Sequence, residues 1–495
     1  RWPTPVAGYA VGIVVTLVSA YLPARRAAQV TPMAAIAATE VPQRHPMRLR
    51  AAAGALITVA GAVALALAAT ADSSGNAAVK LGFGIGLTLI GMVALGPLLA
   101  RPVVRAVGAV FPPLFGAVGR ISQRNALRNP RRTGATGSAL MIGLALVAGL
   151  SVVGTSMAGS IDRQIEETLG ADFTVQNRNF VPFTKEVTER VRDTPGVSTV
   201  IRQRIAPAVI QADGDRGKVL VIGADPQLDQ GLRPNYIAGD TARGLADGHI
   251  VVSGGYARDH GLWLGDRVRL TFASGRSESL VIGAITPAME GQAVGNGTNP
   301  MVGMETMERN APGTLDAAVM ANVAPGYDKD QVKAALERSL APYPNVQVRD
   351  QADYKDLVRG QINVLLGMVY GLLGLAIVIA ILGVVNTLAL SVIERTREIG
   401  LLRAIGLSRR QLRRMVRLES VVIAVFGALL GIVLGLVWGV AAQRILVLEG
   451  MKVLEIPWTV IVTVMAGSVL VGIVAALLPA LRASRMNVLE AIAHE

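Results

Sequence analysis

Seven apolar stretches, almost free of charged residues, divide this chain of 495 residues. A helix rises about 1.5 Å per residue, so about 20 apolar residues cross a hydrocarbon core of about 30 Å. The pattern therefore predicts an α-helical polytopic membrane protein with about seven spans, the first of them shorter than most of the others. The expected spans are residues 6–22, 51–70, 81–100, 135–157, 364–392, 418–442 and 458–480.

A polar segment with a different pattern, residues 158–358, separates the fourth stretch from the fifth. Its β-rich runs alternate with Gly, Asp and Pro, which is typical of strands joined by turns. The runs are ADFTVQ, KVLVIGAD, HIVVS, RVRLTF and SLVIGAI. Near each end of the segment, an amphipathic helical pattern precedes a proline-containing turn and a strand, as expected for two halves of one sheet. We therefore predict an α+β domain inserted between two spans.

Composition and charge place these elements relative to a membrane. Hydrophobic residues make up 52% of the chain and the mean hydropathy is +0.47, which is high for a soluble protein. The net charge is +13, yet residues 158–358 hold 21 Lys and Arg against 26 Asp and Glu. The positive excess lies in short loops beside apolar stretches, a pattern typical of cytoplasmic loops and not of a nucleic-acid-binding face. We expect a multi-pass protein of the cell membrane with its large domain outside and residues 25–50, 101–132, 395–417 and 482–485 in the cytoplasm.

Several kinds of chemistry find no support in the residues. The chain has no cysteine, and its four histidines show no spacing suited to a metal site. No Gly-x-x-x-x-Gly-Lys-Ser/Thr sequence occurs, since Gly217 and Lys218 are followed by Val219, and no nucleophile elbow is present. We therefore predict no catalytic residues, no metal and no cofactor in this chain.

The two ends of the chain carry similar segments. Residues 22–37 (LPARRAAQVTPMAAIA) and 478–493 (LPALRASRMNVLEAIA) are identical at eight of sixteen positions, and each follows an apolar helix. A duplicated transport module explains this similarity. The first span would then be the last helix of an earlier copy, most of which precedes residue 1. The predicted divisions are 1–40 (end of a first module), 41–119 (two linker spans), 120–157 (amphipathic segment and first span of a second module), 158–358 (inserted domain) and 359–495 (three-span domain).

The most specific motif lies between the fifth and sixth spans, in LSVIERTREIGLLRAIGLSRRQLRRMVRLES at residues 390–420. Glu394 and Glu398 are one helical turn apart and should share a face, Gly406 should end the helix, and Ser408 should cap the next one. The stretch resembles the Glu-Arg-x-x-Glu-Ile-Gly-x-x-Arg-Ala-x-Gly motif of FtsX-like permeases. The resemblance implies a helix that docks on a cytoplasmic ATPase. The candidate coupling residues are Glu394, Arg395, Arg397, Glu398, Ile399, Gly400, Arg403, Ala404, Gly406, Arg409 and Arg410. A basic helix that only anchors to lipid is the alternative.

Three further segments extend this resemblance. HGLWLGDRVRLTF at residues 260–272 resembles the Leu-x-x-Gly-Asp-x-Val strand of MacB-like extracytoplasmic domains. The basic residues 120–137 resemble the amphipathic segment before such a module, although a simple topology signal is equally compatible with them. In the sixth span, glycines at four-residue spacing predict either tight helix packing or a sliding face. They are Gly427, Gly431, Gly435 and Gly439.

The resemblance implies a permease of an ABC transporter. A separate cytoplasmic ABC ATPase, acting as a dimer, would bind ATP and magnesium, and its work would move the outer domain. The expected outcome is export or extraction of a lipid, lipoprotein, peptide or drug, with membrane lipid and an extracytoplasmic substrate-binding or adaptor protein as further partners. The alternatives are a regulator of an extracytoplasmic cell-wall enzyme and a membrane receptor without a transport cycle.

Overall fold

The computed structural model describes residues 3–28, 47–71, 74–179, 181–212, 215–287, 299–448 and 451–486. The chain falls into two units, residues 1–52 and 53–495. The first unit contains α1 (Pro3–Ala28), whose apolar part runs from Gly8 to Tyr21. The first predicted span is therefore a helix. Residues 29–40 of its predicted tail and residues 487–493 of the second similar segment lie outside the described residues.

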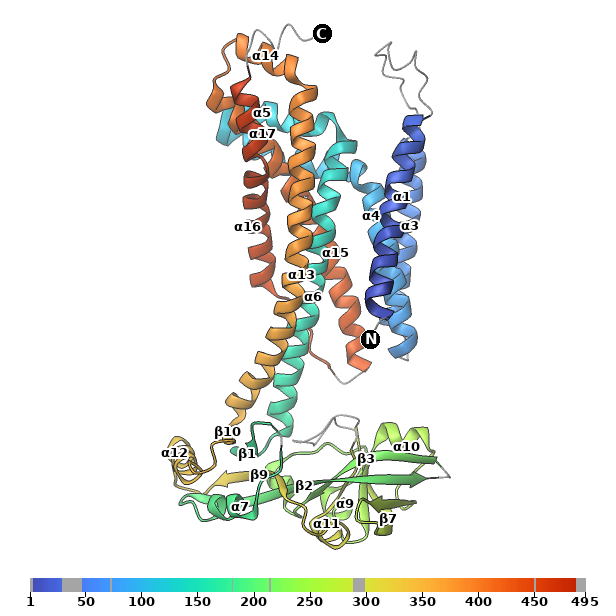
Figure 1. The fold of residues 1–495 in the computed structure, drawn as a ribbon, viewed down its shortest axis with the longest axis vertical. Coiled ribbons are helices and arrows are strands. Elements are labelled where there is room, and N and C mark those ends of the chain that lie inside the picture. Colours follow the sequence, from blue (N-terminus) through green and yellow to red (C-terminus); the bar gives the residue numbers. More distant parts are fainter. Residues whose placement is uncertain are drawn as a thin grey trace. The chain divides into compact units, whose positions relative to one another are not determined.

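Six helices in the described part of the chain are long and apolar enough to cross a membrane, which confirms the six later spans (Figure 1). Several are longer than their apolar stretches because the helix continues through polar flanking residues; the span predicted at 135–157 belongs to a helix of 39 residues. The six are α3 (Met47–Ala69), α4 (Ser74–Gly108), α6 (Pro130–Thr168), α13 (Gln351–Glu394), α15 (Arg409–Leu448) and α16 (Trp458–Ala475).

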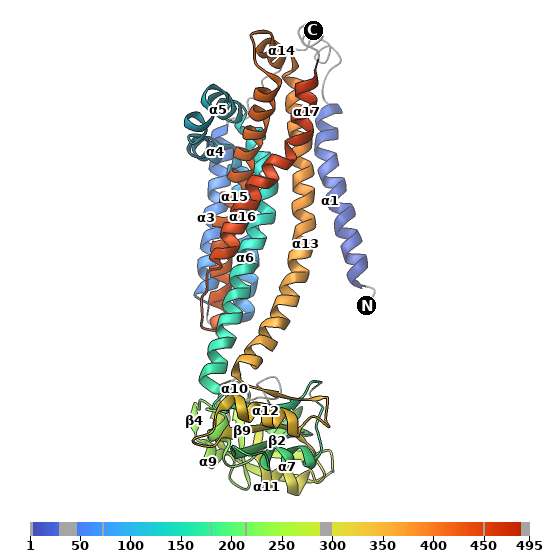
Figure 2. The ribbon, with the colours of Figure 1, turned by 90° about the vertical axis from the view of Figure 1, so that its left-hand side faces the viewer.

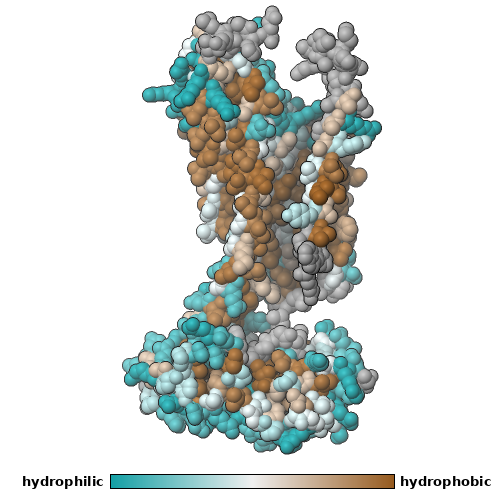
Figure 3. Space-filling view, in the orientation of Figure 1, coloured by the Kyte–Doolittle hydropathy of each residue, from teal (hydrophilic) through white to brown (hydrophobic). Residues whose placement is uncertain are grey.

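Within the second unit, α6 and α15 pack closely against each other, α13 lies along α6, and α16 lies along α15 (Figures 1 and 2). The linker helix α4 also contacts α6 and α15, and the buried Trp438 indole of α15 donates a hydrogen bond to Thr88 Oγ1 of α4 at 2.9 Å. Apolar residues cover much of the outer surface of these helices, whereas the inserted domain is mainly hydrophilic outside (Figure 3). This distribution suits helices surrounded by lipid.

Helices α6 and α13 continue into the inserted domain, which contains a mostly antiparallel sheet of ten strands (Figures 1 and 2). The strand order is β10-β1-β9-β2-β3-β8-β5-β7-β4, and β6 pairs with β2 and β7. The strands are β1 (Phe173–Asn177), β2 (Val197–Ala212), β3 (Asp215–Ala224), β4 (Ala238–Gly239), β5 (His249–Ser253), β6 (Arg267–Phe272), β7 (Ser277–Thr286), β8 (Met301–Gly303), β9 (Asp316–Val323) and β10 (Val346–Arg349). Each β-rich run identified in the sequence is a strand, which confirms the predicted fold class.

Both predicted amphipathic helices pack on one face of the sheet. They are α7 (Lys185–Arg192) and α12 (Lys329–Ser339), and their Val187 and Leu336 side chains join Phe173 in one buried cluster. At the predicted turn before β6, Gly265 has φ of +94°, a conformation that favours glycine, and Asp266 accepts a hydrogen bond from the Trp263 amide. The remaining helices here are α8 (Leu228–Gly231), α9 (Thr241–Gly244), α10 (Gly254–Asp259) and α11 (Met304–Asn310).

Candidate coupling site

The predicted coupling residues lie around two chain corners between α13 and α15. Helix α13 ends at Glu394, Arg395 takes a non-helical conformation, and the short helix α14 (Thr396–Ala404) follows. Gly406 then has φ of +105°, which ends the turn after α14. Ser408 Oγ accepts the Gln411 amide at 3.2 Å and caps α15. The predicted break at Gly406 and the predicted serine cap are both confirmed.

The structure corrects the prediction that Glu394 and Glu398 lie on one continuous helix. The corner at Arg395 separates them, because Glu394 ends α13 and Glu398 belongs to α14. Each carboxylate pairs with an arginine from a distant part of the chain. Arg132 Nη1 lies 2.7 Å from Glu394 Oε2, and Arg128 Nη1 lies 2.7 Å from Glu398 Oε1. Both acids are therefore engaged within this chain.

The two arginines flank a further corner, between α5 and α6, which lies beside the corner at Arg395. Arg128 ends α5 (Phe111–Arg128), and Arg132 lies in the first turn of α6. Asn129 between these helices is non-helical, and Thr133 Oγ1 donates to the Ala126 carbonyl at 2.8 Å, which fixes the corner. The sequence predicted an amphipathic segment or a topology signal here, but not the pairing of its arginines with Glu394 and Glu398. Opposite charge with matching four-residue spacing was the available signal.

Two more of the predicted residues bond within the chain. Arg395 Nε lies 3.1 Å from Glu398 Oε2, and Arg395 Nη1 lies 3.8 Å from Glu419 Oε2 in α15. Arg403 donates a hydrogen bond from Nη1 to the carbonyl of Met486, the residue that follows α17 (Leu477–Arg485). The α14 segment is thus tied to α5, α15 and the end of α17.

The opposite face of α14 is open. Ile399 and Gly400 are buried beneath it, whereas Leu401 is 50% exposed and Ile405 is 81% exposed. Leu401 and Ile405 are four residues apart, so the two apolar side chains form one patch at the end of the helix. The other predicted residues here are exposed as well: Arg397, Ala404, Gly406, Arg409 and Arg410.

Electrostatics favours the ionised form of Glu398. Partial burial alone would raise the pKa of this carboxyl, but the hydrogen bonds from Arg128 and Arg395 outweigh it and bring the pKa below its usual range. A carboxyl with a lowered pKa contributes its pairing energy at neutral pH and loses it only as the pH falls through that lowered value. The pairs around Glu398 are therefore formed at neutral pH.

The predicted glycine stripe of α15 lies against α6. A Cβ atom on Gly431 would lie 2.8 Å from the Met141 carbonyl oxygen, and one on Gly439 would lie 2.5 Å from the Val152 side chain. Such distances leave no room for a side chain, so the two backbones approach closely. Gly427 and Gly435 face α6 in the same way. All four glycines thus lie on one packed face.

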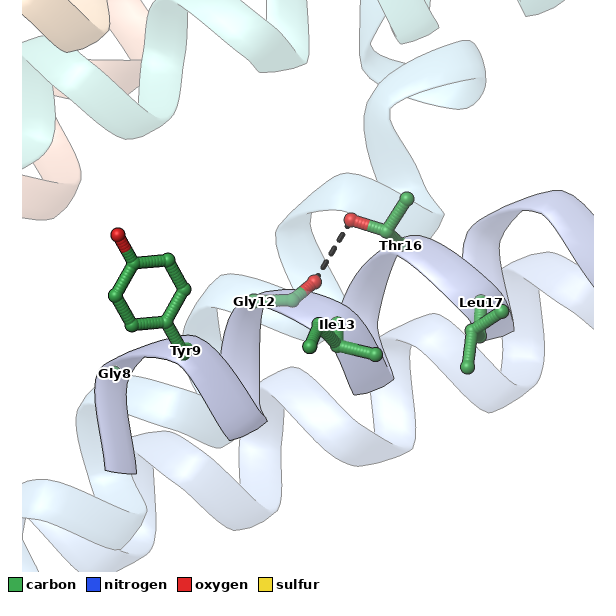
Figure 4. Close-up of a pocket in the computed structure, with 6 residues that line it drawn as sticks. All are labelled: Gly8, Tyr9, Gly12, Ile13, Thr16 and Leu17. Carbon is green, nitrogen blue, oxygen red and sulfur yellow. Dashed lines mark hydrogen bonds between the residues drawn. The ribbon is translucent and has the colours of Figure 1, made fainter. Parts of the chain in front are cut away.

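Cavities also lie outside the candidate coupling site. One of about 620 Å³ lies against α1 in the first unit, and none of its lining residues is charged (Figure 4). Its lining residues are Gly8, Tyr9, Gly12, Ile13, Thr16 and Leu17. A second, of about 480 Å³, lies in the inserted domain beside Arg202, which pairs with both Asp225 and Glu308. Within the described ranges, no three or more His, Asp or Glu side chains are placed to hold a metal ion.

Two parts of the second unit match known protein families. Residues 133–339 match the family model of the MacB-like periplasmic core domain, and residues 370–488 match that of the FtsX-like permease C-terminal domain. A macrolide export ATP-binding/permease protein MacB of Rhodopirellula baltica is 30% identical over 34% of this chain and 24% of that protein. An uncharacterized ABC transporter permease protein of Mycobacterium tuberculosis is 23% identical over 83% of this chain and 49% of the relative.

The chain therefore matches at most about half the length of these relatives. Among solved structures, the periplasmic region of MacB from Actinobacillus actinomycetemcomitans aligns with a TM-score of 0.30 and 9% identity, over 38% of this chain and 94% of that one. The family models, and not this alignment, identify the inserted domain as a periplasmic core domain.

Proposed function

Because residues 133–339 belong to the MacB-like periplasmic core family and residues 370–488 to the FtsX-like permease family, we propose that this chain is the permease part of an ABC transporter. A separate cytoplasmic ABC ATPase, working as a dimer, binds ATP and magnesium and grips α14. The resulting displacement moves the periplasmic core domain. This chain itself performs no catalytic step and contributes no cofactor.

The open face of α14 is the observation that carries this proposal. Ile405 is 81% exposed at the end of a helix that lies beyond the membrane-spanning part of α13. Burying an isoleucine side chain yields about 2 kcal/mol, so an exposed apolar pair outside the bilayer favours a protein partner. The arginines beside this pair, at positions 397, 409 and 410, suit an acidic rim on that partner.

Helix length supports the relay to the outer domain. Helices α6 and α13 contain 39 and 44 residues, so at about 1.5 Å per residue they are about 58 Å and about 66 Å long. A hydrocarbon core of about 30 Å leaves roughly half of each helix outside the membrane. A movement at the cytoplasmic end is thereby delivered to the periplasmic core domain without passage through a flexible loop.

The transported molecule belongs to the proposal as a class. A lipid, lipoprotein, peptide or drug is exported or extracted from the outer leaflet, and an adaptor or substrate-binding protein outside the membrane receives it. Support for export comes from the names of relatives, since MacB of Rhodopirellula baltica is named as a macrolide exporter. A regulator of a cell-wall enzyme would use the same α14 site, and cross-linking of the core domain to such an enzyme would favour that function.

Affinity purification of the full-length protein from its own membranes tests the proposal. We expect an ABC ATPase to co-purify with the wild type and to be lost from the Leu401→Asp/Ile405→Asp variant, because two charges replace the apolar patch. Ile237→Asp is the matched control, since Ile237 is an exposed apolar residue of the core domain at 63% exposure. Retention of the ATPase by the α14 variant, or its absence from the wild type, would contradict the proposal.

A further inference from the structure

Helix α6 is not directly connected to α14 along the backbone. Helix α13 leads directly into α14, and α15 follows after the turn at Gly406. Helix α6 enters the same periplasmic core domain as α13, but its cytoplasmic end is joined to α5. A force applied to α14 therefore reaches α13 and α15 through the backbone, whereas it reaches α6 only through the packing of α6 against these helices and through ion pairs.

Four charged residues at two matching corners make such a contact. At one corner Arg128 and Arg132 flank Asn129, and at the other Glu394 and Glu398 flank Arg395. The arginines and the glutamates are each four residues apart, and both pairs close at 2.7 Å. We call the residues Arg128, Arg132, Glu394 and Glu398 the corner clasp. Arg132 and Glu394 are 262 residues apart in the sequence, and Arg128 and Glu398 are 270 residues apart, so only the tertiary fold brings each pair together.

A third connection holds the clasp to α15. Arg395 bridges Glu398 at 3.1 Å and Glu419 at 3.8 Å, and the Glu419 side chain is only 12% exposed. An arginine side chain that is ordered once and contacts two carboxylates loses less conformational entropy per contact than one in an isolated pair. The network thus joins α5, α6, α13, α14 and α15 at a single level of the molecule.

The exposure of the clasp argues against a role in stability alone. The Arg128 and Glu398 side chains are 63% and 43% exposed, and pairs of this kind contribute only about 0.2–1 kcal/mol. Stability would be gained more effectively by apolar packing at the same place. Two ion pairs with direct hydrogen bonds do, however, fix the position of one corner relative to the other.

We propose that Arg128 and Arg132 are positioning residues that clamp the α5–α6 corner onto the α13–α14 corner, so that α6 and α13 move together when α14 is displaced. This inference rests on the proposed function and deepens it. It also assigns Glu394 and Glu398 to ion pairs within the permease, with the contact to the ATPase left to Leu401 and Ile405.

The test measures the two helices separately in the full-length protein with its co-purified ATPase. These 495 residues contain no cysteine, so spin labels attach to two introduced cysteines once any cysteine elsewhere in the full-length protein or in the ATPase has been replaced. Arg131→Cys with Arg482→Cys reports the cytoplasmic end of α6, and Ile393→Cys with Arg482→Cys reports the end of α13. The labelled sites are exposed. Distances are recorded with and without ATP in the wild type, in Arg128→Glu/Arg132→Glu, and in the fourfold charge exchange that adds Glu394→Arg/Glu398→Arg.

We expect both distances to change with ATP in the wild type. In the double reversal the α13 change persists, while the α6 change falls by about fivefold or more, since attraction becomes repulsion at both corners. The fourfold exchange restores the α6 change. Arg120→Glu/Arg124→Glu is the matched control, with the same change of charge at exposed positions for which no ion pair is found in the described chain. It should behave as the wild type.

Equal α6 changes in the double reversal and in the control would overturn the clasp. Loss of both changes in the double reversal, with ATPase still bound and no recovery in the fourfold exchange, would also overturn it, since it would indicate a structural defect. Failure of either distance to change in the ATP-bound wild type would instead contradict the proposed function. If the double reversal does not accumulate, Arg128→Gln/Arg132→Gln replaces it. This variant removes both positive charges without adding repulsion, so the α6 change should again fall while the α13 change persists.

Discussion

Lys355 Nζ lies 2.6 Å from Glu166 Oε1, and this ion pair joins the outer ends of α13 and α6. Asp162 and Arg359 pair one helical turn away, through the Arg359 Nε at 2.9 Å and a second guanidinium nitrogen. In the middle of the two helices, Ser151 Oγ and Tyr370 OH are 2.9 Å apart. Together with the corner clasp, these contacts join α6 and α13 at three levels along their length.

Reversal of the outer acids should separate the two helices where they enter the core domain. In Asp162→Lys/Glu166→Lys, like charges face each other, so we expect the distance between spin labels on the outer ends of α6 and α13 to increase and its distribution to broaden. Glu167→Lys is the matched control, because Glu167 pairs only with Arg163 of its own helix. An unchanged distribution in the double variant would show that these pairs do not hold the helices together.

A methyl group at Gly435 should disrupt the contact between α15 and α6. Its Cβ would lie 2.7 Å from the Ala148 Cβ and also against the Ala145 carbonyl, neither of which can rotate away. Overpacking of this kind costs about 1–3 kcal/mol, so Gly435→Ala should lower the Tm in detergent. Gly371→Ala in α13 is the control, because nothing lies within 4 Å of a Cβ there. An equal Tm for both variants would contradict the tight packing.

The segment 451–457 should be released from α6 when its two serine contacts are removed. The Val453 amide donates to Ser160 Oγ at 3.0 Å, and the Glu455 amide donates to Ser156 Oγ at 3.0 Å. Each hydrogen bond contributes about 1 kcal/mol, so Ser156→Ala/Ser160→Ala should accelerate hydrogen exchange at both amides several-fold. Thr463→Val is the control, since the Thr463 hydroxyl bonds only within α16. Unchanged exchange in the double variant would contradict this contact.

Acidification should loosen the first turn of α13 inside the periplasmic core domain. Burial would raise the pKa of Asp350, but hydrogen bonds from the Asp353 amide and from Lys333 outweigh it and lower the pKa. The stabilisation is therefore complete above about pH 4, the ordinary pKa of aspartate, and is lost as the pH falls through the lowered value. The pKa of Lys333 is raised, so its pairing is complete at neutral pH and persists in mildly alkaline solution.

Hydrogen exchange of residues 351–356 between pH 7 and pH 3, corrected for intrinsic rates, measures this effect. Protection should stay constant to about pH 4 and then fall. Asp350→Asn keeps a capping side chain but removes the titrating group, so its profile should be flatter. Identical profiles for the two proteins would show that Asp350 does not control this turn.

Much of the fold follows from local pattern. Apolar runs of about 20 residues predicted the spans, because the length and apolar character of a segment are enough to indicate that it can cross a bilayer. The positions of Gly406 and Ser408 predicted the end of one helix and the cap of the next. Both α6 and α13 were predicted too short. Both helices continue through charged residues such as Asp162 and Arg359, whose pairing depends on the neighbouring helix and leaves no trace in either segment alone.

The candidate site was predicted less completely for the same reason. The motif identified the segment around α14, but not which side of it is free. Arg395 carries no helix-breaking signal, so the corner that turns Glu398 inward could not be foreseen. The partners Arg128 and Arg132 lie more than 260 residues away from the glutamates in sequence, and only the tertiary fold brings them together.

A single cysteine at Ile405 tests the central claim most directly. These 495 residues contain no cysteine, so once any cysteine elsewhere in the protein or in the ATPase has been replaced, a membrane-impermeant maleimide applied to sealed vesicles of known orientation reports this position alone. We expect Ile405→Cys to react only from the cytoplasmic side and to be protected when the ATPase is bound. Labelling from the outer side, or equal labelling with and without the bound ATPase, would contradict it.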